Sequence, residues 1–392
     1  MKILQVLSGG GWGGGAVVVL AITRALIARG DRVWVLCLDD QVARRFQAAG
    51  ASIVRSLFWF RAINPLDAVA LAQLIALCLR QRFDLVDTHT SKGGFLGRLA
   101  ARVAGVPHIV HHAHGFSFNQ VTGASRRFYI ALERLAARAG HFTISVSEEH
   151  RLTALEAGIE PPEKISTILN GIDLKPFAAV DRAAARRALG FDSKDLIIGA
   201  VGRLSAQKGF EYLIRALPAV LQAVPAARLA IAGDGPLEIE LRQLAFHCGV
   251  QDRVRFLGFR KDIPQLLAAF DVFALPSLWE GLSISLMEAM ATGKAIVATD
   301  IWGNREMVDP EKTGLLAPPA NPAALAAALR RVLLDRPLAQ ALQQNARQAA
   351  LLRYSEQRMV EQTLALYDGL AQPQPRTAHA AGSSFEQSLI ER

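Results

Sequence analysis

The sequence has few cysteines and no long apolar run, and both absences exclude classes of protein. Only three cysteines occur among 392 residues (Cys37, Cys78 and Cys248), and none belongs to a Cys-x-x-Cys or Cys/His cluster. Such isolated cysteines argue against a disulfide framework and favour a reducing compartment. Without a Cys/His cluster, we expect no structural zinc site. No run reaches the roughly 18 uncharged apolar residues that cross a bilayer, and the opening MKILQVL is too short for a signal peptide. We therefore expect a cytoplasmic protein.

Acidic residues are in the minority, with 35 Asp and Glu against 44 Lys and Arg and a formal net charge of +9. Such an excess is typical of proteins that bind nucleic acid or an anionic membrane face. The basic residues do not interleave with aromatics, so we expect no nucleic-acid partner. A solvated surface and attraction to an anionic membrane both stay open. The cluster Leu57–Phe60 lies between two arginines and suits either buried core or a membrane interface.

Short apolar runs alternate with longer helix-like stretches along most of the chain. In the first half we expect strands at Ile3–Leu7, Val33–Leu38, Leu85–Thr88, Ile109–His112 and Phe142–Ser145. In the second half we expect strands at Leu196–Val201, Leu229–Ala232, Val254–Phe256, Val272–Leu275 and Ala295–Ala298. Strands this apolar are typical of parallel sheets covered by helices on both faces. We therefore predict an α/β protein with two doubly wound, Rossmann-like domains facing a central cleft.

Breaks in the pattern divide the chain. Prolines, an Asn-Gly pair and a Lys-Pro pair interrupt regular structure between residues 160 and 177. We expect a first domain at 1–170, a second at 171–354, and a helix at about 355–370 that packs back on the first. The tail at 372–392 is poor in apolar residues and is predicted to be disordered. Ligands of such sheets bind beyond the carboxyl ends of the strands, so the site should lie in the cleft.

Glycine dominates the loop after the first predicted strand, where six of the seven residues at 9–15 are glycine. Gly9, Gly11 and Gly14 satisfy the G-x-G-x-x-G pattern of dinucleotide-binding folds. A loop with so many glycines matches that pattern by chance, so the match alone does not indicate a dinucleotide cofactor. An NAD-dependent oxidoreductase that uses this loop and Asp39 is an alternative.

Two cations share a loop at a later strand end. In GAVGRLSAQKGF a strand ends at Gly202, and Arg203 and Lys208 follow before a helix. Cations beside a helix N-terminus form a site for a phosphate or diphosphate. Solvated surface charges would give the same pattern.

Two acids in WEGLSISLMEAM, Glu280 and Glu288, flank the start of a predicted helix. The backbone N–H groups of Leu282, Ser283 and Ile284 are free at that helix start. Carboxylates there suit a polyhydroxyl ligand, because they accept paired hydrogen bonds from hydroxyls. A buried helix that happens to begin with an acid is the alternative.

These motifs together resemble retaining glycosyltransferases of family 4. EGLSISLMEAMATGK is similar to that family's E-G-[FL]-x-[IL]-x-x-x-E-A-M-A-x-G signature, and VGRLSAQKGFEYLI to its G-R-L-x-x-x-K-G loop. NGID is similar to the Asn-Gly-[VI]-Asp that precedes the family's second domain. Three spaced motifs in family order make the resemblance specific, and the fold that it implies is GT-B.

The resemblance implies roles for these residues. Arg203 and Lys208, in the loop that begins at Gly202, would hold the diphosphate of a nucleotide sugar and stabilise the leaving charge. Glu288 would hold the ribose hydroxyls. Glu280, with the amides of the helix start, would hold the hydroxyls of the donor sugar.

The resemblance also implies that no metal or other cofactor is needed, and the chain lacks an Asp-x-Asp triplet that would suggest a metal. The nucleobase would contact the backbone near Phe259 and Arg260. Gly13 and Gly14 resemble the family's glycine pair, whose backbone approaches the diphosphate and acceptor from across the cleft.

His114, in His-Gly-Phe after a strand, matches the family's cleft histidine, which contacts the donor sugar near the reacting carbon. For His111 and His112, within the predicted strand, a structural role is the better interpretation. The run that begins at Ser91 and Lys92 looks like members that build capsule, O-antigen or other surface polysaccharides on a polyprenyl-diphosphate lipid. Lys92 would then meet the phosphates of that lipid.

The sequence thus predicts a retaining, metal-independent enzyme on the inner face of the plasma membrane. It would move a sugar from a UDP-linked donor to a lipid-linked saccharide. No carboxylate is placed as a nucleophile, and the resemblance implies front-face substitution, in which the leaving phosphate draws the acceptor proton. A sugar-nucleotide epimerase of the same fold is an alternative. The oxidoreductase is a weaker one, because it leaves the cations and acids of the second half unexplained.

Overall fold

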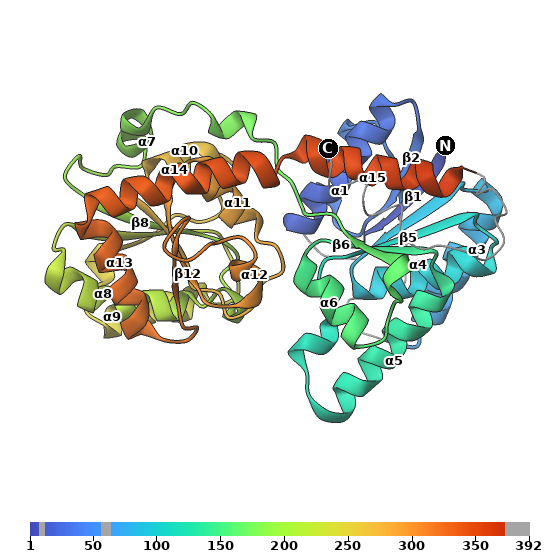
Figure 1. Cartoon of the computed structure of the whole chain (residues 1–392), viewed down its shortest axis with the longest axis horizontal. Coiled ribbons are helices and arrows are strands. Elements are labelled where there is room, and N and C mark those ends of the chain that lie inside the picture. The colour runs from blue at the N-terminus through green and yellow to red at the C-terminus, as the bar shows by residue number, and fades with distance from the viewer. Residues whose placement is uncertain (8–11, 56–63, 373–392) are drawn as a thin grey trace.

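The computed structural model describes residues 1–7, 12–55 and 64–372, which form two lobes, each a parallel sheet with helices on its faces (Figure 1). The first sheet has seven strands in the order β3-β2-β1-β4-β5-β6-β7. These strands are β1 (Lys2–Leu7), β2 (Arg32–Leu36), β3 (Ser52–Val54), β4 (Leu85–His89), β5 (His108–Ala113), β6 (Phe142–Ser145) and β7 (Ile165–Thr167). The helices of this domain are α1 (Gly14–Ala28), α2 (Asp40–Ala48), α3 (Asp67–Gln81), α4 (Ser91–Val103), α5 (Gly123–Ala139) and α6 (Glu148–Glu156).

The second sheet has six strands in the order β10-β9-β8-β11-β12-β13. They are β8 (Leu196–Val201), β9 (Ala227–Ala232), β10 (Val254–Phe256), β11 (Val272–Leu275), β12 (Ala295–Thr299) and β13 (Leu315–Ala317). The helices around it are α7 (Arg182–Ala188), α8 (Phe210–Ala223), α9 (Glu238–His247), α10 (Ile263–Ala269), α11 (Ile284–Ala291), α12 (Trp302–Arg305), α13 (Pro322–Leu334) and α14 (Arg336–Arg353).

Both sheets are parallel throughout, so the predicted α/β fold of two Rossmann-like domains is confirmed. Central strands are fully buried, as every residue of β4 and β12 shows. The sequence pattern misses β3, β7 and β13, which have three residues each and lie at sheet edges. An edge strand has one neighbouring strand and less burial, so it leaves a shorter apolar run.

The chain crosses between the domains twice, at one place. Ile172 donates its backbone N–H to the carbonyl of Tyr354 and accepts from the N–H of Glu356, both at 2.9 Å. A Cβ atom at Gly171 would lie 2.3 Å from the carbonyl oxygen of Ser355, so only glycine fits this crossing. Beyond it, α15 (Glu356–Ala371) leaves the second domain and lies beside α1 of the first (Figure 1).

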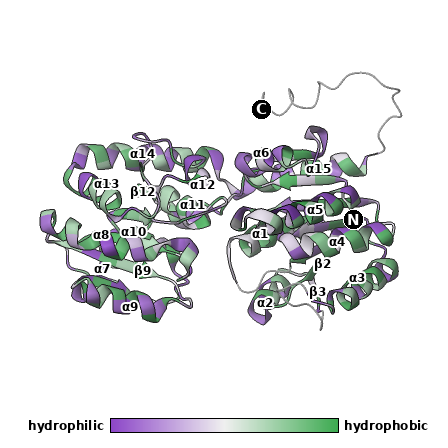
Figure 2. Ribbon diagram, turned by 90° about the horizontal axis from the view of Figure 1, so that it is seen from below, coloured by the Kyte–Doolittle hydropathy of each residue, from purple (hydrophilic) through white to green (hydrophobic). Residues whose placement is uncertain are grey.

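The helices carry both hydrophobic and hydrophilic residues, as amphipathic surface helices do (Figure 2). In the described part of the chain, no helix combines the length and the apolar character needed to span a membrane. The cluster Leu57–Phe60 and almost all of the predicted disordered tail lie outside the described residues.

Candidate active site

Two helix N-termini meet where the domains face each other. A Cβ atom at Gly14, the first residue of α1, would lie 2.9 Å from the side chain of Ile284, the first residue of α11. Neither helix has an acidic residue in its first turn, and neither N-cap residue, Gly13 or Ser283, makes a side-chain capping bond. Without side-chain caps among the described residues, the first N–H groups of both helices give this part of the cleft a positive potential that suits an anion.

Glu280 and Lys208 form an ion pair in the second domain. The Lys208 Nζ lies 2.5 Å from Oε1 of Glu280, and the side chains are 15% and 6% exposed. The Ser277 hydroxyl donates to the same carboxylate oxygen at 2.6 Å. The structure thus brings the predicted diphosphate ligand Lys208 to the predicted sugar ligand Glu280.

Arg203 lies in the same loop but is exposed, and none of its side-chain nitrogens has a hydrogen-bond partner among the described residues. Two glycines of the neighbouring strand end support this loop. A Cβ atom at Gly233 would lie 1.9 Å from the carbonyl oxygen of Gly202, and one at Gly235 would lie 2.4 Å from that of Leu204. Both glycines also have positive φ. A side chain is therefore excluded at either position by the close contact and by the backbone conformation.

Glu288 lies on α11 and differs from Glu280 in having no partner. Within the described part of the chain, no donor reaches its carboxylate; the bonds of this residue run from its carbonyl to Thr292. Burial raises the pKa of Glu288 to about 7. An acid in this state accepts hydrogen bonds from hydroxyls once it ionises.

Gly281, between these acids, touches the first domain. A Cβ atom at this position would lie 3.1 Å from the carbonyl oxygen of His114 and 3.0 Å from the ring of His150. The predicted cleft histidine His114 therefore lies against the loop that carries Glu280. Burial, with the nearby rings of His89 and His112, lowers the pKa of His114 well below its usual value.

His114 belongs to a buried polar cluster that the sequence analysis did not identify. His89 Nδ1 lies 3.2 Å from His114 Nε2, and Asp87 accepts from His112 Nδ1 at 2.9 Å and from the Tyr367 hydroxyl at 2.5 Å. A signal was present, because Asp87 and His89 lie two positions apart at the end of a buried strand and therefore share one of its faces.

His111 lies on the other face of β5, with its Nδ1 3.0 Å from both the hydroxyl and the carbonyl oxygen of Thr88. A Cβ atom at Gly94 would lie 2.4 Å from its ring, so His111 is enclosed by α4. His111 and His112 are both buried.

Asp87, His89 and His112 form the one group of metal-ligand type found within residues 1–7, 12–55 and 64–372, with ligand atoms within 4.8 Å of one another. The rings of His89 and His112 stack, with centroids 4.8 Å apart and planes at 16°. Because a ring nitrogen binds a metal in the plane of its ring, two stacked rings are poorly placed to share one ion. The hydrogen bond from His112 to Asp87 and the 3.1 Å approach of His89 to the same carboxylate account for the group.

The predicted acceptor residues have partners of their own. Ser91 accepts a hydrogen bond from the Ser117 hydroxyl at 2.9 Å, and Lys92 lies 2.5 Å from the carboxylate of Asp67.

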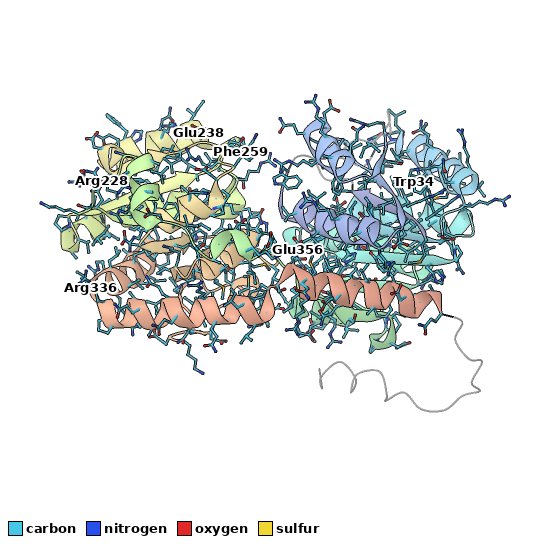
Figure 3. All side chains as sticks on the ribbon, turned by 90° about the horizontal axis from the view of Figure 1, so that it is seen from above. Trp34, Arg228, Glu238, Phe259, Arg336 and Glu356 are labelled. Carbon is cyan, nitrogen blue, oxygen red and sulfur yellow. The ribbon has the colours of Figure 1, made fainter. Side chains whose placement is uncertain are left out.

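The two residues predicted near the nucleobase differ in exposure. Phe259 is 52% exposed and lies on the side of the second domain that faces the first (Figure 3). Arg260 forms a two-bonded ion pair with Asp262.

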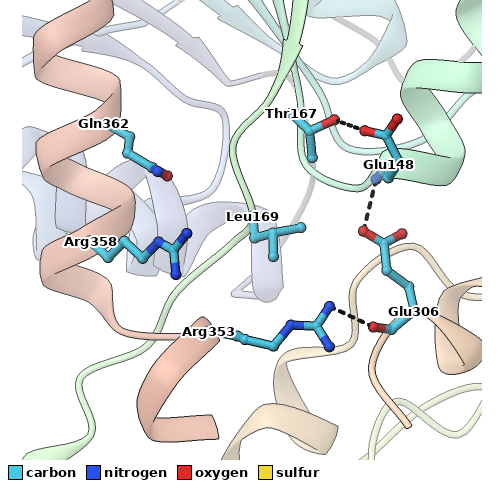
Figure 4. A pocket seen from close by; sticks show the side chains of 7 residues that line it. All are labelled: Glu148, Thr167, Leu169, Glu306, Arg353, Arg358 and Gln362. Atoms are coloured by element: carbon cyan, nitrogen blue, oxygen red, sulfur yellow. Dashed lines mark hydrogen bonds between the residues drawn. The ribbon is translucent and has the colours of Figure 1, made fainter. Parts of the chain in front are cut away.

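A pocket of about 330 Å³ lies beside the crossing, lined by Glu148, Thr167, Leu169, Glu306, Arg353, Arg358 and Gln362 (Figure 4). At its edge the carboxylate of Glu306, from the second domain, accepts from the backbone N–H groups of Glu148 and Glu149 at 2.8 and 3.4 Å. Glu306 therefore caps the N-terminus of α6 from across the domain boundary.

Comparison with known proteins agrees with this geometry. The model described as Glycosyltransferase Family 4 matches residues 12–176, and the model described as Glycosyl transferases group 1 matches residues 181–349. Two facing Rossmann-like domains are the GT-B fold, and the two matching models identify it here as the fold of a glycosyltransferase. The chain belongs to the family 4 glycosyltransferases.

Two curated relatives and one solved structure illustrate the likeness. The UDP-Gal:alpha-D-GlcNAc-diphosphoundecaprenol alpha-1,3-galactosyltransferase of Escherichia coli is 37% identical over 256 residues, covering 64% of this chain and 66% of the relative. The putative glycosyltransferase EpsD of Bacillus subtilis is 30% identical over 78% of this chain and 81% of the relative. Anabaena HepE, solved in complex with UDP and glucose, superposes with a TM-score of 0.81 at 25% identity, covering 94% of this chain and all of that one.

Proposed function

We propose that the chain transfers a sugar from a UDP-linked donor to a lipid-linked saccharide, with retention of configuration at the sugar carbon and without a metal. The meeting of two uncapped helix N-termini, with Lys208 paired to Glu280 in the segment just before α11, carries this proposal. Such a site stabilises the negative charge that develops on a leaving diphosphate.

In the proposed reaction the bond between the sugar carbon and the diphosphate oxygen breaks, and the acceptor oxygen bonds to the same face of that carbon. The acceptor proton passes to the leaving phosphate. Glu280 does not act as the nucleophile, because its carboxylate is engaged by Lys208 and Ser277. It holds donor hydroxyls instead, and Glu288 holds the ribose.

The names of the relatives support the substrate classes. The relative from Escherichia coli is named for a UDP-sugar donor and a diphosphoundecaprenol-linked acceptor, and the Anabaena structure contains UDP. We therefore propose an acceptor on a polyprenyl diphosphate, in the synthesis of capsule, O-antigen or another surface polysaccharide.

Incubating the protein with UDP-sugars and a GlcNAc-diphosphopolyprenol acceptor, in the presence of EDTA, tests this function. We expect a longer lipid-linked saccharide whose new linkage has the donor's anomeric configuration. An inverted linkage, or activity that EDTA abolishes and Mg²⁺ restores, would contradict the mechanism. UDP released without any acceptor would favour the epimerase alternative.

We also propose that the protein attaches to the anionic inner face of the plasma membrane. Each basic residue near such a surface contributes about 1 kcal/mol, and salt screens this attraction. We expect binding to anionic vesicles that weakens at high salt without vanishing, and that Trp59→Ala combined with Phe60→Ala removes most of the remainder. Flotation of vesicles measures it, and equal binding to neutral and anionic vesicles would argue against the electrostatic attraction.

A further inference from the structure

A row of closely spaced buried polar groups runs from the last helix to the cleft. The Tyr367 hydroxyl of α15 donates to Asp87 Oδ2, and His89 Nε2 lies 3.1 Å from that same oxygen, close enough for electrostatic attraction but without the alignment of a hydrogen bond. The other nitrogen of His89, Nδ1, lies 3.2 Å from His114 Nε2. Tyr367, Asp87 and His89 are fully buried, whereas His114 is half-buried at the cleft.

Asp87 is ionised in this row. Burial works to raise the pKa of Asp87, but His112 and His89, which lie against its two carboxylate oxygens, outweigh it and hold that pKa below its usual value. Burial and the neighbouring carboxylate raise the pKa of Tyr367, so its hydroxyl keeps its proton and donates.

The carboxylate selects a tautomer for His89. A ring nitrogen 3.1 Å from an anionic oxygen is favoured as N–H, because a lone pair facing that oxygen would be repelled. Neutral His89 with a proton on Nε2 has only a lone pair on Nδ1. Two lone pairs cannot bond, so His114 Nε2 must carry the proton that joins it to His89 Nδ1.

With this tautomer, one ring nitrogen of His114 is left to bind a ligand. With Nε2 protonated, the Nδ1 of neutral His114 is a hydrogen-bond acceptor and cannot donate. Among the described residues no donor reaches this Nδ1. The atom is not fully enclosed by protein, so a ligand can reach it.

We propose that Asp87 and His89 are positioning residues that fix His114 in its Nε2–H tautomer, so that its Nδ1 accepts a hydrogen bond from a hydroxyl of the donor sugar. The identity of that ligand rests on the function proposed above, whereas the tautomer does not. The contribution of Asp87 resembles that of a carboxylate that orients a catalytic histidine.

Nitrogen NMR of the ¹⁵N-histidine-labelled full chain tests the tautomer directly, because protonated and bare ring nitrogens have distinct shifts. We expect His114 of the unaltered protein to carry its proton on Nε2. A proton on Nδ1, or zinc bound stoichiometrically to the purified protein through His89 and His112, would overturn the proposal.

Variants test whether Asp87 sets the His114 tautomer through His89. In Asp87→Asn an amide can face His89, which favours the opposite tautomer in both rings, and we expect turnover to fall roughly 10- to 100-fold, as for loss of a buried hydrogen-bond partner. His89→Asn can keep an oxygen acceptor near the former Nδ1 and should preserve the His114 tautomer, whereas His89→Leu should not. Tyr367→Phe is the matched control, because it leaves both histidine contacts of Asp87 in place.

A merely structural role predicts a different set of results. It would lower the melting temperature and the UDP affinity in Asp87→Asn and His89→Leu, with no change in the His114 shifts. That outcome would overturn the proposal. If the tautomer behaves as expected but no sugar is transferred, then the proposed function fails while the positioning of His114 holds.

Discussion

At the scale of single residues, the two acids of the second domain have different surroundings. Glu280 shares one oxygen with Lys208 and Ser277, whereas Glu288 lies on the adjoining helix without a donor among the described residues. The first is held in place before any substrate arrives. The second is ready to accept hydrogen bonds, and its protonation depends on pH near neutrality.

Binding of UDP should therefore depend on Glu288 ionisation. Burial raises its pKa to about 7, so the acceptor carboxylate forms as the pH rises through that value. We expect UDP affinity to increase about 10-fold or more across this range, as for a hydrogen bond to a charged group. Glu288→Gln should flatten the profile in calorimetry, and Glu280→Gln, as the control, should retain it. The same slope in both variants would contradict the ribose assignment.

Substitutions of Arg203 and Lys208 should lower turnover alike but differ in their effect on stability. Either change to alanine should lower turnover roughly 10²–10³-fold, the range for removing one preorganised group that stabilises charge. Lys208→Ala also strips the cation from the buried Glu280, so its melting temperature should fall. Arg203→Ala should leave the melting temperature unchanged, because that side chain is exposed. Normal turnover in both variants would exclude the diphosphate role.

At the scale of elements, sequence periodicity predicts the central strands and the edge strand β10, but not the edge strands β3, β7 and β13. Runs such as Leu196–Val201 are apolar because both faces are covered, and the pattern predicts them to the residue. The motifs likewise predict the loop of Lys208 and the start of α11. The pattern cannot predict that Asp87 meets Tyr367, since 280 positions separate them in the chain and only folding joins them.

The contact between α1 and α11 provides a matched pair of glycines. A Cβ atom at Gly14 would lie 2.9 Å from Ile284, whereas one at Gly15 would have nothing within 4 Å. Gly14→Val should push the two helix starts apart and lower kcat/KM roughly 10²-fold, as for a small misplacement of reacting groups. Gly15→Val should retain most activity. Steady-state kinetics of the two variants checks this, and equal loss in both would show that the contact is unimportant.

At the scale of the whole molecule, the two domains are connected beside the cleft and at the crossing. Glu306 caps α6 from the other domain, and Arg353 donates to the carbonyl of Glu306 at 2.9 Å (Figure 4). Glu149 lies near this cap, and burial together with the charge of Glu306 raises its pKa to about 7.

Stability should therefore fall between mildly acidic and neutral pH. The folded pKa of Glu149, about 7, exceeds its ordinary value of 4.5, so its stabilising protonation is complete below about pH 4.5 and is lost as the pH rises through 7. Glu149→Gln should reduce this decline in melting temperature. Glu156→Gln, an exposed change on the same helix, is the control. A wild-type decline that persists in Glu149→Gln would place its origin elsewhere.

The position of α15 also has a consequence for synthesis on the ribosome. The first domain is made first, but its Asp87 and part of its core are covered by Met359 and Tyr367, which are made after the whole second domain. The second domain is contiguous and can mature as soon as α14 leaves the exit tunnel. The domain that is translated first therefore completes its folding last. Part of its core stays exposed until α15 has been synthesised.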